Sequence, residues 1–350
     1  MARIRMGVAV VAAAWLLLAG CSSDDNDEAT PTTESAASPA DAGPQPSAGC
    51  GTTTVSPGVE KVTMTSGGVE RWYLQHLPPA YDGEEPVPLV VDIHGYSEGA
   101  EFHATNSGLG EFGDTKGFVT ITPQALGDVP FWDTALGSAD LAFVGDLLDQ
   151  VEETLCVDEA RIYATGLSNG AMMTSSVACA YADRIAAVAP VAGVTQVEDC
   201  DPEQPVPVVA FHGTEDPFLN YTGGFGPAVA SLPAPDGQGT LGDLSPEQQA
   251  DMNDTAGATG IAVPDVMAGW ADRNGCDADP PEETTEADDV TVLTFACPAG
   301  ADVELYRIEG GGHTWPGSHA LEGVDFVGKT TFSISANDVM WAFFQDHPLG

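Results

Sequence analysis

The sequence predicts an α/β domain with a mostly parallel central sheet and helices on both faces. From Val69 onward, short apolar runs of strand length alternate with amphipathic or alanine-rich stretches of helix length. Strands that alternate with helices are typical of a parallel sheet covered on two sides. The chain has 350 residues, of which 43% are hydrophobic, so it can bury a large core without a metal or cofactor.

The expected elements follow one another as short strands and longer helices. Strands are expected at residues 69–77, 89–93, 118–121, 161–165, 185–191, 206–211, 290–295 and 303–308. Helices are expected at residues 141–155, 169–181, 263–274 and 336–346. Segment 223–260 is rich in Gly, Pro and Asp, so we expect an insertion there, either a lid or an inert surface loop.

The first residues are expected to be a targeting segment. Arg3 and Arg5 precede an apolar run over residues 7–18, which is too short for a comfortable membrane span. The sequence Leu-Ala-Gly-Cys ending at Cys21 resembles a bacterial lipobox, in which the cysteine is diacylated. We therefore expect a lipoprotein signal peptide at 1–20 and a lipid anchor at Cys21. The alternative is an ordinary secretory signal followed by an incidental cysteine.

Residues 21–49 are expected to form a disordered acidic linker, because the segment after Cys21 has no aliphatic side chain larger than alanine. The globular domain is then expected at 50–350. Together these features predict an exported protein, either anchored in the cell envelope through Cys21 or released outside the cell.

Six cysteines remain after Cys21, and an even number in an exported chain indicates disulfides. Six cysteines allow 15 pairings, and free buried thiols are the alternative. Economy of nearest neighbours favours the pairs Cys276–Cys297, Cys179–Cys200 and Cys50–Cys156. The chain has no Cys-x-x-Cys pair, so a zinc site is not expected.

The charge balance is strongly acidic, with 53 acidic against 10 basic residues and a formal charge of −43. Such a charge argues against nucleic acid or an anionic membrane surface as a direct partner. We interpret it as an adaptation for solubility, suited to salty surroundings that screen self-repulsion. Calcium could bind acidic side chains, but the spacing of an EF-hand is absent and no metal is expected.

The pattern Gly-x-Ser-x-Gly occurs twice, around Ser97 and around Ser168. In the nucleophile elbow of α/β-hydrolases this serine stands on a sharp turn between a strand and a helix. Ser168 has an expected strand before it and an expected helix after it. Ser97 also follows a strand, but residues 100–110 are expected to make a poor helix. Ser168 is therefore the predicted nucleophile.

The Gly-x-Ser-x-Gly pattern around Ser97 is then expected to belong to the oxyanion hole. A His-Gly pair after an early strand supplies one backbone N–H of the oxyanion hole in this architecture, and His94-Gly95 is such a pair. We expect the N–H of Tyr96 to be that donor, with the N–H of Ser97 as the alternative. The N–H of Asn169 is expected to be the second donor. The ring of His94 is expected to be structural.

A serine hydroxyl needs a base with a pKa near 7, which means histidine, and a carboxylate that orients the base. His313 follows three glycines and an expected strand and is the predicted base, with His319 in reserve. Asp216, in the turn after another expected strand, is the predicted acid, with Glu215 as the alternative. His212 is expected to be a turn residue.

The motifs GLSNGAMM around Ser168, FHGTEDP around Asp216, RNGC and GGGHTWPG around His313 occur in this order. From about Val69 to the end, the chain resembles the secreted polyhydroxybutyrate-depolymerase-like esterases, a family that includes feruloyl and acetylxylan esterases. The resemblance implies an α/β-hydrolase fold and the Ser168–Asp216–His313 triad. It also marks Trp315 and Trp132 as walls of the acyl or aromatic subsite, with core packing as the alternative.

Two departures bear on the substrate. Segment 223–260 is longer than the family pattern, and no polymer-binding module follows before Gly350, which weakens the case for an insoluble polyester. The sequence thus predicts a carboxylic ester hydrolase without a cofactor, acting on a small ester or on a fragment of an oligomer or polymer. The alternatives are an acyltransferase with the same triad and an inactive surface lipoprotein.

Overall fold

The computed structural model describes residues 43–52, 56–249, 260–277 and 280–350. By its internal contacts the chain divides into a unit at 1–36 and a second unit at 37–350, and every described residue belongs to the second. The expected signal peptide, the expected anchor at Cys21 and the expected linker as far as residue 42 lie outside the described residues.

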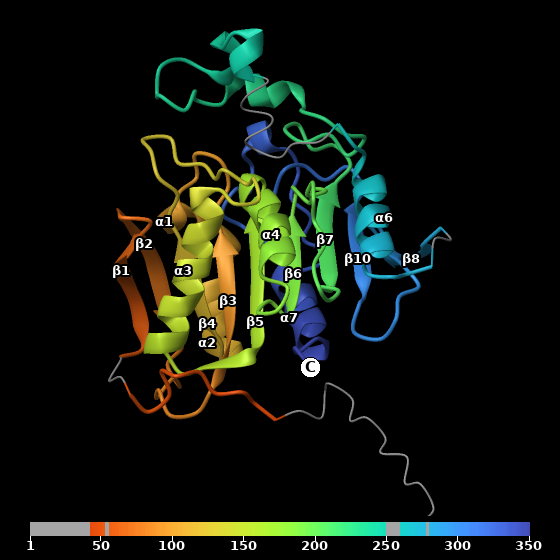
Figure 1. Cartoon of the computed structure of the whole chain (residues 1–350). Coiled ribbons are helices and arrows are strands. Elements are labelled where there is room, and N and C mark those ends of the chain that lie inside the picture. Colours follow the sequence, from red (N-terminus) through yellow and green to blue (C-terminus); the bar gives the residue numbers. More distant parts are fainter. Residues whose placement is uncertain (1–42, 53–55, 250–259, 278–279) are drawn as a thin grey trace, which may run out of the picture. The chain divides into compact units, whose positions relative to one another are not determined.

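The described residues form a ten-stranded sheet. Its six middle strands are parallel, and two antiparallel strands flank them on each side. In spatial order the strands are β1 (Gly58–Ser66), β2 (Val69–Leu77), β4 (Val119–Pro123), β3 (Val87–Ile93), β5 (Val157–Leu167), β6 (Ala187–Val191), β7 (Val208–Gly213), β10 (Val303–Ile308), β9 (Val290–Thr294) and β8 (Glu282–Ala287). Figure 1 shows the sheet from β1 at one edge to β8 at the other.

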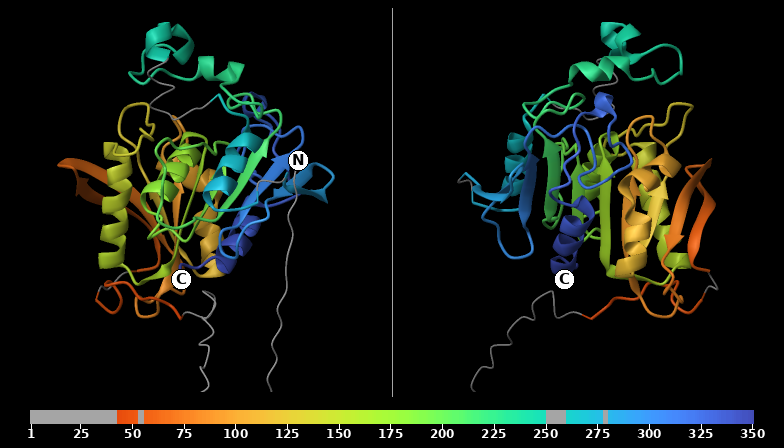
Figure 2. Two further views of the ribbon diagram at one scale, coloured as in Figure 1. Left: turned by 45° about the vertical axis from the view of Figure 1, so that its right-hand side comes forward. Right: turned by 180° about the vertical axis from the view of Figure 1, so that it is seen from behind.

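Helices cover both faces of the sheet, as Figures 1 and 2 show. The α-helices are α1 (Ala100–Ser107), α2 (Leu109–Lys116), α3 (Ala139–Thr154), α4 (Asn169–Ala180), α6 (Val263–Arg273) and α7 (Ala336–Asp346). Helices α3, α4 and α6 pack into one apolar cluster, and α2 and α7 pack into a second. Short 3-10 turns lie at η2 (Pro227–Ser231), η3 (Leu241–Asp243) and η4 (Asp325–Val327). The predicted α/β class with a mostly parallel, doubly covered sheet is confirmed.

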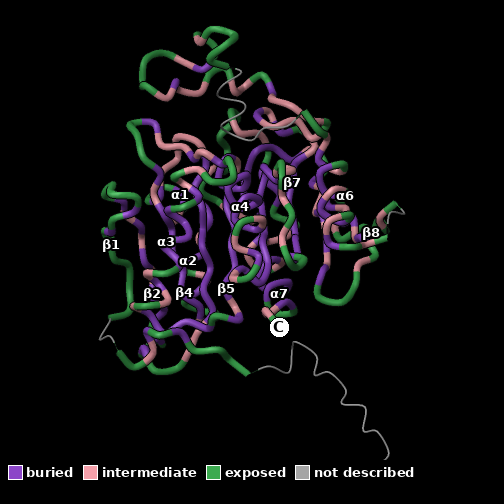
Figure 3. Tube along the Cα trace, in the orientation of Figure 1, coloured by how far each residue is buried: buried purple, intermediate pink, exposed green. Residues whose placement is uncertain are grey.

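Burial follows this layering. In Figure 3 the middle strands are buried along their length, whereas β1 and the segment after β7 are largely exposed. Strands β3 to β7 are apolar on both faces because helices cover both of their faces. Strand β1 was not expected from the sequence, because an exposed edge strand lacks the apolar run that marks a buried one.

Helix α1 corrects one expectation directly. Residues 100–110 are expected to make a poor helix, yet they contribute α1 and the start of α2. The buried side of α1 is polar, since it consists of Ala100, His103, Asn106 and Ser107. A helix whose buried face is polar gives no apolar periodicity, so pattern reading misses it.

The structure contains three disulfides, and they are the pairs that economy of neighbours favours. They join Cys50 to Cys156, Cys179 to Cys200 and Cys276 to Cys297. The first closes a separation of 106 residues and ties the start of the folded unit to the beginning of β5. Closing a long loop restricts the unfolded chain most, so this bridge is expected to contribute most to stability.

The expected boundary between linker and domain at 49/50 is wrong by several residues. The backbone N–H of Gln45 donates to Asp158 (2.8 Å), and the Ser47 hydroxyl donates to the carbonyl of Leu155 (2.6 Å). The N–H of Ser47 also donates to the carbonyl of Val157 (3.0 Å). Small polar residues therefore belong to the fold here, because backbone and hydroxyl groups pair with the amino end of β5 without any apolar burial.

Candidate active site

Ser168 stands alone between β5, which ends at Leu167, and α4, which begins at Asn169. Its φ of 58° lies in the left-handed region that non-glycine residues rarely adopt, so the turn is strained. The turn is closely packed: a Cβ added at Gly170 would lie 2.0 Å from the carbonyl oxygen of Ile93. Only glycine fits there, and this is the physical reason for the glycine after the serine.

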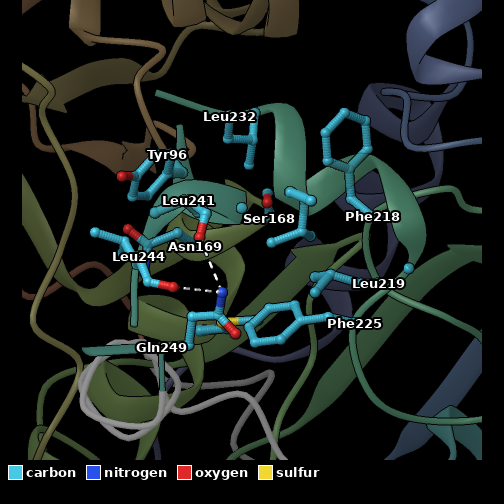
Figure 4. A pocket seen from close by; sticks show the side chains of 15 residues that line it. Tyr96, Ser168, Asn169, Phe218, Leu219, Phe225, Leu232, Leu241, Leu244 and Gln249 are labelled. Atoms are coloured by element: carbon cyan, nitrogen blue, oxygen red, sulfur yellow. Dashed lines mark hydrogen bonds between the residues drawn. The ribbon is translucent and has the colours of Figure 1, made fainter. Parts of the chain in front are cut away.

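Ser168 lies at the carboxyl edge of the sheet, where it lines a pocket of about 250 Å³. Its N–H donates to the carbonyl of Val191 at the end of β6 (2.9 Å), which fixes the turn against the neighbouring strand. Figure 4 shows Ser168 among the pocket side chains, between Asn169 and Phe218. The hydroxyl thus reaches a space that can hold a ligand.

Asp216 and His313 come from two neighbouring parallel strands. Asp216 follows β7, and His313 follows β10, which pairs with β7. The Nδ1 of His313 lies 2.7 Å from Oδ2 of Asp216. Because an ionised carboxylate only accepts hydrogen bonds, Nδ1 donates to it, and Nε2 has no hydrogen-bond partner among the described residues. The pair is buried, with the whole residues 8% and 4% exposed.

The carboxylate of Asp216 is held from its other side as well. Its Oδ1 accepts the backbone N–H groups of Phe218 (2.8 Å) and Leu219 (2.9 Å). Burial alone would raise the pKa of Asp216, but His313, His212 and these N–H groups outweigh it and lower the pKa. Asp216 is therefore ionised at neutral pH and oriented toward the imidazole.

The loop that carries His313 is pinned by backbone bonds. The N–H of His313 donates to the carbonyl of Val327 (2.6 Å), and that of Gly312 donates to the carbonyl of Lys329 (2.8 Å). The ring of Phe218, which lines the pocket, lies 4.9 Å from the imidazole between centroids. Among the described residues, no hydrogen bond joins Ser168 Oγ to the imidazole in this structure. Catalytic hydrogen bonds are often longer in the absence of substrate.

The loop after β3 passes directly beside the serine. A Cβ added at Gly95 would lie 3.4 Å from the Cβ of Ser168. The N–H of Ser97, the alternative oxyanion donor, is taken by the carbonyl of Pro130 (2.7 Å). Within the described part of the chain, the N–H groups of Tyr96 and Asn169 have no acceptor. Two unused donors therefore lie in the turns that flank Ser168.

His94 is a buried structural residue, as expected. Its Nε2 accepts the N–H of Ala125 (3.0 Å), so Nδ1 carries the proton, and it lies 2.7 Å from the carbonyl of Gly95. Burial lowers the pKa of His94 to about 4 and keeps the ring neutral. The indole of Trp132 donates to the carbonyl of His94 (2.8 Å), so both rings brace the loop that carries Tyr96.

A buried charged cluster supports the same loop from α1. His103 lies with Nε2 2.7 Å from Asp92 and Nδ1 3.0 Å from Glu98. Glu98 also accepts the N–H of Gly95 (2.7 Å), and Ser107 donates to Asp92 (2.6 Å). Burial would lower the pKa of His103, but the two carboxylates raise it to about 10. The sequence reasoning missed this Asp92–Glu98–His103 cluster, since its members are apart in sequence and follow no motif.

Neither tryptophan of the expected subsite reaches the pocket. Trp132 is 0% exposed and Trp315 is 1% exposed, and neither is among the described residues that line the pocket of Ser168. The indole of Trp315 instead donates to Asn337 (2.8 Å), and its ring meets His103 edge-on. The expectation that these side chains form a substrate wall is therefore replaced by its alternative, core packing.

The Asn169 side chain forms a pair of hydrogen bonds with the backbone of Trp132 (2.7 and 3.2 Å).

The reserve candidates lie away from the pair of Asp216 and His313. Glu215 is exposed, and His319 has a side chain that is 74% exposed and pairs with Glu322. His212 is buried beside Asp216 (3.5 Å), with Nε2 2.9 Å from the carbonyl of Leu219, and burial lowers its pKa. His212 lies in β7 and not in the expected turn, and its ring is placed beside the carboxylate of Asp216.

The pocket walls come mainly from residues that sequence reasoning did not single out. Apolar side chains dominate, and Figure 4 shows Phe218, Leu219, Phe225, Leu232, Leu241 and Leu244 around Ser168. Most of them belong to the expected insertion at 223–260, of which residues 250–259 are outside the described part.

Among the helices that the structure describes, none combines the length and the apolar character that a membrane span requires. Nor do the His, Cys, Asp and Glu side chains of the described residues form a group of three or more that could hold a metal.

The chain is similar in sequence to proteins named as esterases. No protein-family model matches the chain. Feruloyl esterase B of Piromyces equi is 26% identical over 247 residues, a match that covers 68% of this chain and 41% of that protein. Feruloyl esterase C of Emericella nidulans is 31% identical over 184 residues, which covers 48% of this chain and 65% of that protein. The chain thus spans less than two thirds of either relative.

Among solved structures, the acetyl xylan esterase from Aspergillus awamori matches with a TM-score of 0.54 at 16% identity. The match covers 82% of this chain and 99% of that one. At this identity the likeness concerns the fold, which is that of the α/β-hydrolases. The predicted resemblance to feruloyl and acetylxylan esterases is confirmed by the relatives and by this structural neighbour.

Proposed function

We propose that the protein is a serine hydrolase that cleaves carboxylic esters through Ser168, His313 and Asp216. One observation carries the proposal: the three residues follow the carboxyl ends of β5, β10 and β7, which are parallel strands of one sheet. Parallel strands bring their carboxyl ends to the same edge. The sequence similarity to proteins named feruloyl esterase supports the same class of reaction.

In the proposed reaction, Oγ of Ser168 attacks the ester carbonyl while Nε2 of His313 takes the hydroxyl proton. The carbonyl oxygen becomes an oxyanion, which accepts hydrogen bonds from the N–H groups of Tyr96 and Asn169. The tetrahedral intermediate collapses, the C–O bond to the alcohol breaks, and His313 returns the proton to the leaving oxygen. Asp216 keeps the proton on Nδ1 and stabilises the imidazolium.

Water then repeats the sequence on the acyl-enzyme. His313 removes a proton from water, the hydroxide attacks the acyl carbon, and the bond to Oγ breaks as Oγ recovers the proton. The products are a carboxylic acid and free Ser168. A shift of the serine side chain or of the His313 loop on substrate binding would form the hydrogen bond between Oγ and Nε2.

The direct test is covalent labelling by a fluorophosphonate together with turnover of p-nitrophenyl acetate and butanoate. We expect one label per chain, found by mass spectrometry on the peptide that contains Ser168, and no label on Ser168→Ala. A chain that neither reacts with the probe nor hydrolyses esters would be an inert scaffold. Acyl transfer to an added alcohol in preference to water would indicate an acyltransferase.

The names of the relatives and the family resemblance suggest three natural ester classes to test: feruloyl esters, acetylated xylan and oligomers of 3-hydroxybutanoate. Turnover of one representative of each would rank them, with the p-nitrophenyl esters as a common reference.

We also propose that the mature protein is exported and anchored by a diacylated Cys21. The three disulfides support an oxidising compartment. Two buried acyl chains would hold the protein at a bilayer. The test is phase separation in detergent: the natural chain should enter the detergent phase, and Cys21→Ser should stay in the aqueous phase. A natural chain found only in the aqueous phase would refute the anchor.

A further inference from the structure

The insertion supplies most of the wall of the pocket next to Ser168. Nine of the fifteen lining residues belong to segment 225–249, which includes η2 and η3. Their side chains include Phe225, Val229, Leu232, Leu241 and Leu244. A surface insertion without a role would expose polar groups to solvent, whereas this one turns aliphatic side chains toward the serine (Figure 4).

Apart from the hydroxyl of Ser168, the polar side chains that line the pocket are hydrogen-bonded to the protein itself. The hydroxyl of Tyr96 donates to the carbonyl of Pro233 (2.8 Å). The Gln249 amide donates to the carbonyls of Leu241 (3.2 Å) and Leu244 (3.1 Å). The Asn169 amide is paired with the backbone of Trp132. Among the described residues that line the pocket, none has a charged side chain.

The size of the pocket limits what it can hold. Its volume is about 250 Å³, whereas a cavity of roughly 10–15 Å³ is enough for one water molecule, so the pocket has room for a chain of several methylene groups. A charged or strongly polar acyl group would lose its hydration there without gaining a partner. An acetyl group would leave most of the space unfilled.

We propose that the pocket formed by segment 225–249 binds the acyl part of the ester and selects unbranched aliphatic acyl groups of about six to eight carbons over acetyl. The assignment rests on the proposed ester hydrolysis at Ser168. Each additional methylene that leaves water for an apolar wall is expected to raise kcat/KM about fourfold until the pocket is filled. Hexanoate, four methylenes longer than acetate, should thus exceed acetate by about 200-fold.

The test compares kcat/KM for p-nitrophenyl acetate, butanoate, hexanoate and octanoate in three chains. Val229→Asp places a charge in the pocket wall. Ser231→Asp places the same charge on the same turn η2, at an exposed residue that does not line the pocket, and serves as the matched control. The natural chain and the control should show the same rise with chain length. Val229→Asp should lose at least tenfold on hexanoate and less than threefold on acetate.

Several outcomes would overturn the proposal: a preference for acetate in the natural chain, an equal loss on acetate and hexanoate in Val229→Asp, or the same loss in both variants. A second measurement separates this inference from the proposed reaction. Calorimetry can measure the binding of intact p-nitrophenyl hexanoate and acetate to Ser168→Ala. This measurement does not depend on turnover. Tighter binding of hexanoate without any hydrolysis by the natural chain would keep the pocket assignment and refute the reaction, whereas equal binding would refute the pocket.

Discussion

The two Gly-x-Ser-x-Gly turns of this chain share the φ of their serine but differ in the groups that surround it. Ser97 and Ser168 both have a φ of 58°, and each lies between a strand and a helix. Ser168 borders a pocket, and Phe218, which lines the same pocket, contacts the imidazole of His313. Among the described residues, that imidazole has a hydrogen-bond partner at Nδ1, Asp216, and none at Nε2. The turn of Ser97 leads into a helix whose imidazole, that of His103, is bound by carboxylates at both nitrogens.

This difference shows that the motif specifies a strained turn, whereas the surroundings specify chemistry. An imidazole can act as a base only where one nitrogen keeps a free lone pair. Both nitrogens of His103 are taken by Asp92 and Glu98, which hold the ring as a cation, whereas Nε2 of His313 has no hydrogen-bond partner among the described residues. The first turn therefore serves as a scaffold that supports the N–H of Tyr96, and the second carries the proposed nucleophile.

The largest difference between the two turns should appear when each serine is replaced by alanine in a separate variant. Ser168→Ala should lower kcat for p-nitrophenyl hexanoate by about 10⁴- to 10⁶-fold, since it removes the nucleophile. Ser97→Ala should change kcat by less than about tenfold, because the Oγ of Ser97 has no role in the proposed reaction. Steady-state kinetics on both chains check this. A comparable loss in Ser97→Ala would remove the functional distinction between the two turns.

The next effect should come from the carboxylate that orients the base. Asp216→Asn should lower kcat by about 10³- to 10⁴-fold, because an amide can stabilise the wrong imidazole tautomer. The neighbouring Glu215→Gln alters an exposed side chain and is the matched control. Circular dichroism should show both variants folded. Full activity in Asp216→Asn would exclude this carboxylate as the partner of His313.

For the cluster behind Ser97, the main effect should be on stability. Glu98→Gln removes one of the two charges that balance His103, and breaking a buried charge pair typically costs about 3–5 kcal/mol. Urea unfolding should show this loss, with Glu101→Gln, at an exposed position on α1, the helix that carries His103, as control. Residual folded Glu98→Gln should also have a lower kcat, because Glu98 fixes the N–H of Gly95 next to the Tyr96 donor. A variant as stable as the control would show that the cluster carries little energy.

The smallest effect concerns how the contribution of His103 to the unfolding free energy changes with pH. The folded pKa of His103 is raised to about 10, so its contribution is complete below the unfolded value near 6.5 and is lost as pH rises toward 10. The unfolding free energy of the natural chain should decline across that window. In His103→Gln this part of the decline should be absent, whatever the absolute stability. Denaturant titrations at pH 6.5, 8 and 9.5 measure it, and parallel slopes in the two chains would refute the assignment.

Much of the central sheet could be predicted, because β3, β5, β6 and β7 are buried on both faces and stand out as apolar runs between turns. Helices α3 and α7 were predictable from their apolar stripes. Helix α1 was not, because charges on β3 and in the adjacent turn satisfy its polar buried face. Such compensation between distant residues leaves no periodic signal in the chain.

The order and context of the motifs pointed to Ser168, Asp216 and His313, and the structure brings Asp216 and His313 into hydrogen-bonding contact. The walls of the pocket could not be predicted in the same way. Leu232, Leu241 and Leu244 lie in a stretch rich in Gly and Pro, where neither helical nor strand periodicity marks which side chains turn inward. The two tryptophans were expected in the subsite because of the family resemblance, but large aromatic side chains also favour the core, where both lie.

The attachment of residues 45–49 determines at which edge of the sheet the preceding chain joins the folded domain. These residues join the fold at the amino end of β5, and Ser168 follows its other end, eleven residues and roughly 35 Å away. A lipid anchor upstream would therefore hold the protein by the edge opposite the pocket.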